Sequence, residues 1–272
     1  MNRGRNFPFK AGPEFRHAPP EEKGGFLFGP GRRPRFAREC GWLALEAGFG
    51  KINGLKRRKI HGPGKKNPTA IPGATVLVRE FSARYAGGIP PWQIDRPQPE
   101  VLRLIRQGKF QSPVLDLGCG TGDNAIALAS SGYRVVAMDP IPEALRRARE
   151  KASRLSLDPS PEFRKGNALS LDKSGLKVAT VLDSAVFHIF SDGDQERYAR
   201  EVGSVLASGG RLHLLSFSER ETRQPGPRRL TLEQISRPFQ AGWVREEAVR
   251  CRYEDLVRAD GAHAWRITFR KA

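Results

Sequence analysis

Short apolar runs alternate with amphipathic stretches along most of the chain, and this alternation predicts strands that alternate with helices. The clearest unit begins at Val114–Leu117, a run that can be buried on both faces. A helix is expected from about Asp123 to Ser131, ending at Gly132, and a second strand from Tyr133 to Met138. Asp139 then stands at the carboxyl end of that strand. The pattern therefore predicts a βαβ half-unit with a ligand site at its switch point.

The same alternation continues on both sides of this unit. A helix opening at Pro97–Pro99 should place Val101, Leu102 and Ile105 on the sheet. Further helices are expected at 142–155, 192–206 (ended by Gly209-Gly210) and 231–239, and strands at 162–165, 178–183, 211–217, 244–253 and 265–270. We predict an α/β fold with a doubly wound, mostly parallel seven-stranded sheet, closed by an antiparallel C-terminal strand pair.

The connection after the first strand is rich in glycine. Gly118, Gly120 and Gly122 free the backbone to turn beside a ligand, where side chains would block the approach. A dinucleotide fingerprint would require a third glycine at residue 123, where Asp123 stands instead. Asp116, two residues before the loop, suits a cationic ligand better than a pyrophosphate. An acid at Asp139 can accept both hydroxyl hydrogens of a ribose.

The stretch D-L-G-C-G-T-G, followed by an acid that ends the next strand, resembles motif I of the class I S-adenosylmethionine-dependent methyltransferases. The resemblance implies a Rossmann-like methyltransferase fold and S-adenosylmethionine as the cofactor. It places the first acid near the cofactor's amino-acid end, the loop over the amino-acid part and sugar, and the second acid on the ribose. The residues concerned are Asp116, Gly118, Cys119, Gly120, Gly122, Asp139 and Pro140.

Asn167 and Ala168 follow the third predicted strand. The family usually has an acid and a small residue there, and the acid accepts from the adenine amino group. Asn167 departs from that pattern, although its amide oxygen can still accept a hydrogen bond. Both residues are therefore expected at the adenine.

The segment Tyr85 to Ile105 resembles a bacterial subgroup related to thiopurine, thiol and halide methyltransferases. Its Tyr, Pro-Pro-Trp and Arg-Pro-Gln-Pro arrangement closes over the methionine end of the cofactor in that subgroup. The resemblance therefore assigns Trp92 and Arg96 to the cofactor and acceptor pocket. The alternative is that Trp92 is a core residue between an N-terminal helix and the sheet.

The exit of the fourth strand should lie close to the transferred methyl group. Asp183 is expected there as a cofactor-binding and catalytic residue, and His188 as a general base for acceptors that need one. A lone histidine after a strand is, however, more often structural. Phe187 and Trp92 are expected as apolar walls, and Arg228 as the group that attracts an anionic or polarisable acceptor.

The formal net charge of +18 is distributed unevenly along the 272 residues. Residues 1–80 hold 17 Lys and Arg against 6 Asp and Glu, a surplus of 11, and the remaining residues hold a surplus of 7. We expect a largely disordered basic Gly/Pro-rich extension at 1–79 and a methyltransferase domain at 80–272. Within the extension, 36–49 can form a short helix.

The favoured function is methyl transfer to a small molecule, with a thiol, a halide or a similar soft nucleophile as acceptor. A nucleic-acid methyltransferase that uses the basic extension as a binding arm is the first alternative. It is weakened because Asp183-Ser184-Ala185-Val186 stands where base methyltransferases carry an N-P-P-Y-type tetrapeptide. A non-catalytic cofactor binder is the second alternative.

The three cysteines are widely spaced and show no metal-ligand pattern, so no metal is expected. The same cysteine usage predicts a reduced, cytoplasmic protein. No apolar run approaches the roughly 18 residues that span a bilayer, and no signal segment follows Met1. We therefore expect a monomer whose partner is a small-molecule acceptor and not a membrane.

Overall fold

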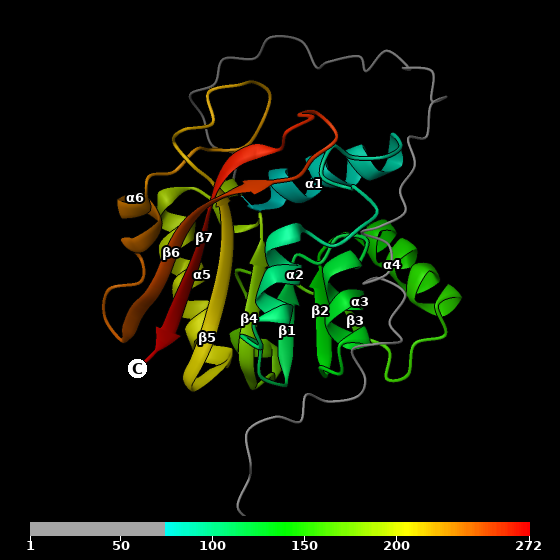
Figure 1. The fold of residues 1–272 in the computed structure, drawn as a ribbon, viewed down its shortest axis with the longest axis horizontal. Helices are drawn as coiled ribbons and strands as arrows, with labels where there is room; N and C mark the ends of the chain where they lie inside the picture. The colour runs from blue at the N-terminus through cyan, green and yellow to red at the C-terminus, as the bar shows by residue number, and fades with distance from the viewer. Residues whose placement is uncertain (1–73) are drawn as a thin grey trace, which may run out of the picture. The chain divides into compact units, whose positions relative to one another are not determined.

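Seven strands form a single sheet in the order β3-β2-β1-β4-β5-β7-β6 (Figure 1). The computed structural model describes residues 74–272, so the predicted extension and its short helix lie outside the described residues. The strands are β1 (Val114–Leu117), β2 (Val135–Asp139), β3 (Glu162–Lys165), β4 (Val178–Ser184), β5 (Leu206–Phe217), β6 (Trp243–Tyr253) and β7 (Ala262–Lys271). β1 to β5 run parallel, and β7 is antiparallel to both β5 and β6. The predicted fold class is confirmed.

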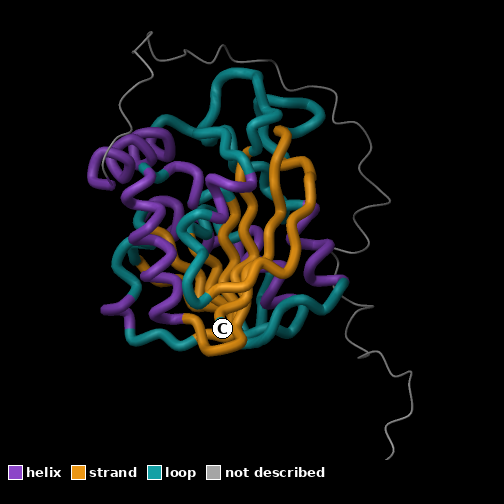
Figure 2. Tube along the Cα trace, turned by 90° about the vertical axis from the view of Figure 1, so that its left-hand side faces the viewer, coloured by secondary structure: helices purple, strands orange, loops and turns teal. Residues whose placement is uncertain are grey.

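The helices lie on both faces of this sheet (Figure 2). They are α1 (Ala74–Ala86), α2 (Pro99–Arg106), α3 (Asp123–Ser130), α4 (Pro142–Arg154), α5 (Asp192–Val205) and α6 (Leu232–Ser236), with 3-10 turns η3 (Asp172–Ser174) and η4 (Phe187–Ile189). α2 and α3 share one core cluster with the sheet, and α5 and α6 belong to the cluster on the other face. α1 lies across the carboxyl ends of the parallel strands (Figure 1). Loops gather at this same edge.

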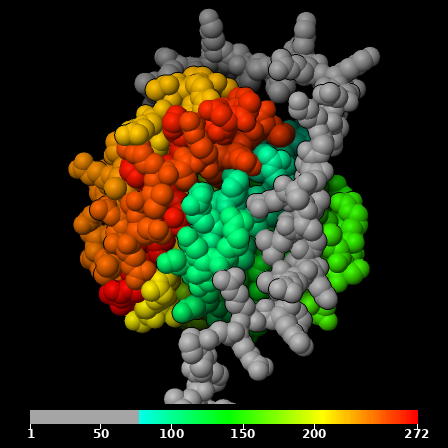
Figure 3. Space-filling view, viewed as in Figure 1, coloured from blue at the N-terminus to red at the C-terminus, as the bar shows by residue number. Residues whose placement is uncertain are grey.

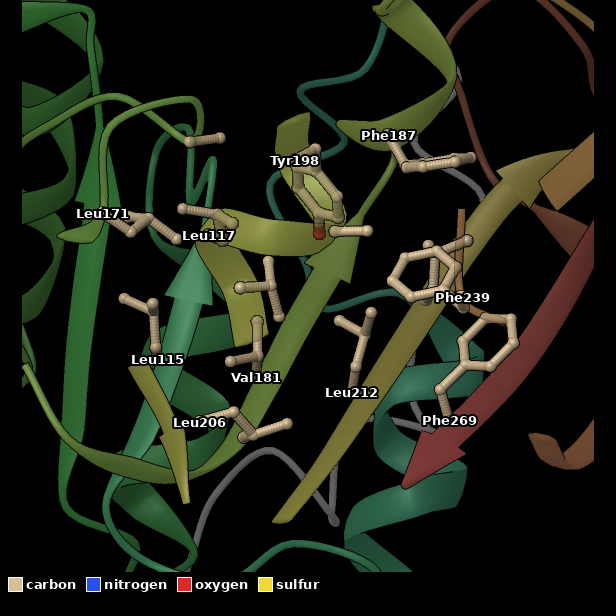
Figure 4. Packing of buried hydrophobic residues seen from close by; sticks show 14 of the residues in the cluster. Leu115, Leu117, Leu171, Val181, Phe187, Tyr198, Leu206, Leu212, Phe239 and Phe269 are labelled. Atoms are coloured by element: carbon tan, nitrogen blue, oxygen red, sulfur yellow. The ribbon is translucent and has the colours of Figure 1, made fainter. Parts of the chain in front are cut away.

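Side chains from α5, α6 and the central strands fill the larger core cluster (Figure 4). Phe239 stacks on Phe269 with 4.4 Å between ring centroids, and Tyr198 is fully buried beside Phe187. Burying a side chain of this size contributes roughly 1.5–3 kcal/mol, so this cluster fixes α5 and α6 against the sheet.

Two local predictions were wrong. α5 ends at Val205, and β5 begins directly at Leu206 and continues through Gly209-Gly210, which do not end the helix. A Cβ on Gly210 would lie 2.9 Å from the carbonyl oxygen of Ala179, so glycine lets β5 approach β4 where their register shifts. On α2, Val101 and Leu104 are fully buried and Ile105 packs against the same core cluster, whereas Leu102, which was also predicted on the sheet, is only half-buried.

α1 was not predicted, and it begins before the expected domain boundary at residue 80. Its Leu77 is buried in the larger core cluster. The last turns of the predicted extension therefore contribute to the core. How residues 1–73 are organised stays a prediction.

Candidate functional site

Strand register brings three acids to one edge of the sheet. β1 pairs with β2 and β4 so that Leu117 lies opposite Met138 on one side and Asp183 on the other. Asp116 and Asp139 are one residue away from this level. Parallel strands therefore place Asp116, Asp139 and Asp183 around the loop that follows β1.

The loop between β1 and α3 exposes backbone at this edge. Gly118, Gly120 and Gly122 all have left-handed conformations, with φ of 71°, 55° and 82°. The amides of Gly118 and Cys119 donate to the carbonyl oxygen of Met138 at 2.7 and 3.0 Å. A Cβ on Gly118 would lie 2.2 Å from Cγ2 of Val186, so no side chain fits there. The glycines are required both by backbone conformation and by close packing.

Asp139 is only 7% exposed and is held by the loop itself. One carboxylate oxygen accepts from the Gly120 amide at 2.9 Å, and the other accepts from the Ile141 amide at 2.8 Å. Burial raises the pKa of this carboxyl to about 6, and the two amides oppose the rise. Each oxygen keeps a second lone pair, so the group can accept two further hydrogen bonds, as a ribose would require. Pro140, between these contacts, is half-buried.

Asp116 is 1% exposed, and neither carboxylate oxygen has a hydrogen-bond partner among the described residues. Burial, and then the nearby charges of Asp139 and Asp183, raise its pKa to about 8. The Ala125 amide lies near enough to lower this pKa in part, but it completes no hydrogen bond. A buried carboxylate without a donor is costly, so this position suits a ligand that brings a cation. The α-ammonium of an amino acid is such a group.

Tyr85, near the end of α1, covers the loop from above. Its hydroxyl accepts a hydrogen bond from Nε1 of Trp92 at 3.1 Å, and it lies 3.2 Å from where a Cβ of Gly120 would stand. Trp92 also packs edge-on against Phe81, with 5.0 Å between ring centroids. Burial, and then the charge of Asp139, raise the pKa of Tyr85 well above its ordinary value. We did not assign Tyr85 from the sequence, although it stands seven residues before Trp92 in the segment that carries the resemblance.

Asp183 is fully buried, and its carboxylate faces the protein. It accepts from the amides of Val186 and Phe187 at 2.8 and 3.0 Å and from the Tyr198 hydroxyl at 2.6 Å. Burial raises its pKa to about 7, while these hydrogen bonds lower it. The geometry argues against the predicted catalytic and cofactor-binding roles of Asp183. It indicates instead that this acid fixes the turn after β4.

His188 is 2% exposed, and it is held in a neutral form. Its Nδ1 accepts from the Phe217 amide at 2.9 Å, which leaves the ring proton on Nε2. Burial lowers the pKa of the imidazole to about 3. A ring whose basic lone pair is already occupied cannot take a proton from an acceptor, so the geometry argues against the predicted general base.

Three residues predicted for the acceptor side have other partners. Phe187 is fully buried against Tyr198 and Phe239, so it belongs to the core and does not form a wall (Figure 4). Arg228 donates to the Phe190 carbonyl oxygen and to Asp192, both at 2.5 Å. Arg96 is an exposed partner of Glu254, with 2.9 Å between Nη2 and the carboxylate.

Val186 was not predicted, yet its side chain covers Gly118. Its place follows from the Asp183 hydrogen bonds, which turn the chain back over the loop. No residue type in the sequence signals this, because valine is ordinary after a strand.

The chain after β3 passes beside Asp139. The Gly166 amide donates to the Asp139 carbonyl oxygen at 3.2 Å, and the Asn167 side-chain oxygen accepts from the Leu169 amide at 2.9 Å. Ala168 is buried. The amide oxygen of Asn167 thus has one lone pair occupied and one available.

Cys119 is half-buried, and burial raises the pKa of its thiol, which is therefore not a reactive thiolate. In residues 74–272 no group of three or more His, Cys, Asp or Glu side chains is placed to hold a metal ion. None of the helices in this range combines the length and apolar character that crossing a membrane requires.

Comparison with known proteins defines the class. The methyltransferase domain family matches residues 114–210. An uncharacterized methyltransferase of Schizosaccharomyces pombe is 32% identical over 135 residues, which cover 48% of this chain and 92% of the relative. The 2-heptyl-1-hydroxyquinolin-4(1H)-one methyltransferase of Mycobacteroides abscessus is 33% identical over 130 residues, 48% of this chain and 57% of that protein. A probable thiol methyltransferase of Arabidopsis thaliana is 30% identical, over 53% of this chain and 63% of its own length.

A solved structure described as "Conversion of a Disulfide Bond into a Thioacetal Group during Echinomycin Biosynthesis" matches with a TM-score of 0.65 and 29% identity. The match covers 72% of this chain and 93% of that one. The chain belongs to the class I S-adenosylmethionine-dependent methyltransferases. The predicted family, enzyme class and cofactor are thereby confirmed.

Proposed function

We propose that this enzyme methylates a small molecule whose acceptor atom is already a soft or anionic nucleophile at neutral pH, such as a thiolate or a halide. The observation that carries this proposal is the state of the two candidate bases. His188 has its basic nitrogen occupied by the Phe217 amide, and Asp183 is held by three donors. Neither of them is available to deprotonate a neutral hydroxyl or an ammonium.

The bound cofactor supplies an activated methyl group on a sulfonium, and the acceptor displaces the sulfur in line. The protein then needs to place the two reactants and exclude water, and placement alone supplies roughly 7–11 kcal/mol of barrier reduction. We assign Asp116 to the ammonium of the methionine moiety and Asp139 to the ribose hydroxyls. Asn167 and Ala168 remain our assignments for the adenine.

The cover over the methionine end is assigned to Tyr85 and Trp92 of the α1–α2 region and to Val186 after β4. Their support is positional, since the Tyr85 hydroxyl lies 3.2 Å from where a Cβ of Gly120 would stand, and Cγ2 of Val186 lies 2.2 Å from where a Cβ of Gly118 would stand. Trp92 supports Tyr85 through its indole hydrogen bond. Together they form an apolar surface that excludes water from the transfer.

The relatives support a small acceptor. The names of two of them specify a hydroxyquinolone and a thiol, both of which are small molecules. Because this chain covers less than two thirds of each of these two proteins, the acceptor of the whole enzyme is a proposal.

A tritiated-methyl assay over thiols, halides, amines and RNA tests the proposal. We expect turnover of thiols, with a rate that rises through the solution pKa of each thiol, because the thiolate is formed before it binds. Turnover of protonated amines at neutral pH would contradict it, and turnover of RNA would favour the nucleic-acid alternative. Cofactor binding without turnover of any acceptor would favour the non-catalytic alternative.

A further inference from the structure

We propose that Arg147 of α4 is a positioning residue for the cofactor site, which holds the end of α1 over the glycine loop and thereby sets cofactor affinity. The inference concerns the cofactor side of the site. It does not depend on which acceptor is methylated.

Arg147 is tied to the chain that leaves α1. Its Nη2 donates to the Tyr85 carbonyl oxygen at 2.9 Å, and its Nη1 donates to the Gly88 carbonyl oxygen at 3.0 Å and to Oε1 of Gln93 at 3.3 Å. The guanidinium also lies 5.7 Å from the centre of the Tyr85 ring, within cation–π range. Nε is oriented by Glu143, one helical turn earlier, at 2.9 Å. One planar side chain therefore fixes both the backbone and the ring of Tyr85.

The contact reaches the cofactor loop through Tyr85. The Tyr85 hydroxyl stands over Gly120, whose amide in turn donates to Asp139. A displacement of Tyr85 would uncover the loop beside the ribose acceptor. The hydrogen bonds of Arg147 go to Tyr85, Gly88, Gln93 and Glu143, so its effect on the loop is transmitted through Tyr85.

A second cation on the same helix face holds the loop from the other side. Lys151, one turn after Arg147, donates to both carboxylate oxygens of Asp123 at 2.7 and 2.8 Å, and to Asp95 at 3.2 Å. Asp123 begins α3 directly after the loop, and Asp95 lies between Trp92 and α2. α4 therefore fastens the segment from Tyr85 to Asp95 and the start of α3 to one rigid element.

The segment is also held on its far side. The Leu256 amide donates to the Pro91 carbonyl oxygen at 2.8 Å, and Gln98 exchanges two hydrogen bonds with the backbone of Glu254. Figure 3 shows the red-orange connection between β6 and β7 packed beside the cyan-green segment that leads into α2. The anchor on the α4 side is the one that touches Tyr85 directly. If that anchor is lost, only a fraction of the molecules has Tyr85 over the loop, and the apparent dissociation constant of the cofactor rises by the inverse of that fraction.

Arg146 provides a matched control. It is the neighbouring residue on α4 and also pairs with Glu143, but its other partner is Glu150 and its side chain is 55% exposed, against 23% for Arg147. Arg146→Gln and Arg147→Gln remove the same charge and the same Glu143 contact from adjacent positions. They differ in the contacts to Tyr85, Gly88 and Gln93.

We expect Arg147→Gln to raise the calorimetric dissociation constant of S-adenosylhomocysteine about tenfold, because the contacts that hold Tyr85 over the loop are lost. The KM for S-adenosylmethionine should rise similarly, while kcat at saturating cofactor changes less than about twofold. Arg146→Gln should leave both unchanged. Arg147→Lys keeps the charge and one donor, so it should restore part of the affinity.

Tryptophan emission of the folded protein distinguishes a displaced Tyr85–Trp92 pair from a general loss of stability. Arg147→Gln should change the emission spectrum of the folded protein, and the change should be absent when both proteins also carry Trp92→Phe. Wild-type affinity in Arg147→Gln, or an equal loss in Arg146→Gln, would overturn the inference. If Arg147→Gln does not fold, the test uses Arg147→Lys. A changed emission spectrum together with wild-type cofactor affinity in Arg147→Lys would also overturn the inference.

Discussion

Asp116 carries a buried carboxylate to which no described residue donates a hydrogen bond. Its pKa of about 8 means that the free protein holds a proton there at neutral pH. A cofactor ammonium would favour the ionised form, so binding near pH 7 should release about one proton, and affinity should rise with pH between 6.5 and 7.5. Calorimetry in buffers of different ionisation enthalpy measures the proton. Asp116→Asn should bind more weakly and release none, and an undiminished proton release in that variant would contradict the assignment.

Asp116 should also make the folding stability of the apoprotein fall as pH rises, whereas cofactor affinity rises. A raised carboxyl pKa in the folded state means that the folded protein loses stability as pH rises from about 4 to 8, because the unfolded chain ionises first. Asp116→Asn removes this penalty. We therefore expect the apoprotein variant to melt about 2–4 °C higher at pH 7.5, the shift that roughly 1 kcal/mol produces in a domain of this size. If the wild-type apoprotein melts at the same temperature at pH 5 and pH 7.5, the Asp116 carboxyl does not have the raised pKa that the argument requires.

His188 offers a separate test of the acceptor chemistry. Asparagine can replace the Nδ1 acceptor for the Phe217 amide, so His188→Asn should fold and retain kcat within about threefold. Its pH–rate profile should match that of the wild-type enzyme. If the wild-type rate rises with pH near pH 6–7 and this rise is missing in His188→Asn, the result would support His188 as the general base.

At the scale of elements, the glycine loop makes a prediction with a built-in control. Gly120 and Gly132 both have positive φ, 55° and 87°, but a Cβ would meet the Tyr85 hydroxyl at 3.2 Å in the first case and nothing within 4 Å in the second. Both alanine variants should lose about 1 kcal/mol of stability from backbone strain. We expect only Gly120→Ala to weaken S-adenosylhomocysteine binding, at least about fivefold by calorimetry. Equal affinities would mean that the loop does not contact the cofactor.

The elements that the sequence predicted are those with local signals. β3 (Glu162–Lys165) was placed to the residue, and α3 and α4 were placed within one residue, because apolar periodicity, Pro142 and the glycine turns mark their ends. The boundary between α5 and β5 was misplaced because Gly209-Gly210 serve a close strand contact, which has the same local signature as a helix stop. Sequence spacing alone does not distinguish the two.

The acceptor side was less predictable for a different reason. Placing His188 and Phe187 after β4 was correct, but their burial depends on the turn that Asp183 holds and on Tyr198, fifteen residues later. Tyr85 was missed because its role depends on α1 crossing the sheet edge, a tertiary contact with no periodic signal. Asp116, Asp139 and the loop glycines do lie together at one edge of the sheet, because the motif and the parallel strand register place them there. Their contact with the cofactor stays a prediction.

At the scale of the whole molecule, the uneven charge makes a prediction about nucleic acid. Residues 1–73 carry most of the positive surplus, while Leu77 of α1 is buried in the core. Deleting residues 1–73 should therefore leave the melting temperature and cofactor affinity unchanged, and it should abolish any salt-sensitive RNA binding of the full chain. A deletion variant that loses cofactor binding would show that the extension forms part of the site. Equal RNA binding with and without the extension would place a nucleic-acid surface on the domain.

The central claim is that the edge formed by β1, the glycine loop and Asp139 binds S-adenosylmethionine. The most direct test is a calorimetric titration of S-adenosylhomocysteine into the wild-type protein and into Asp139→Asn, with the exposed Asp172→Asn as control. Wild type and control should bind one ligand with equal affinity. Asp139→Asn should bind at least about tenfold more weakly, because its amide group cannot accept from both ribose hydroxyls and the loop amides. Unchanged affinity in Asp139→Asn would contradict the account.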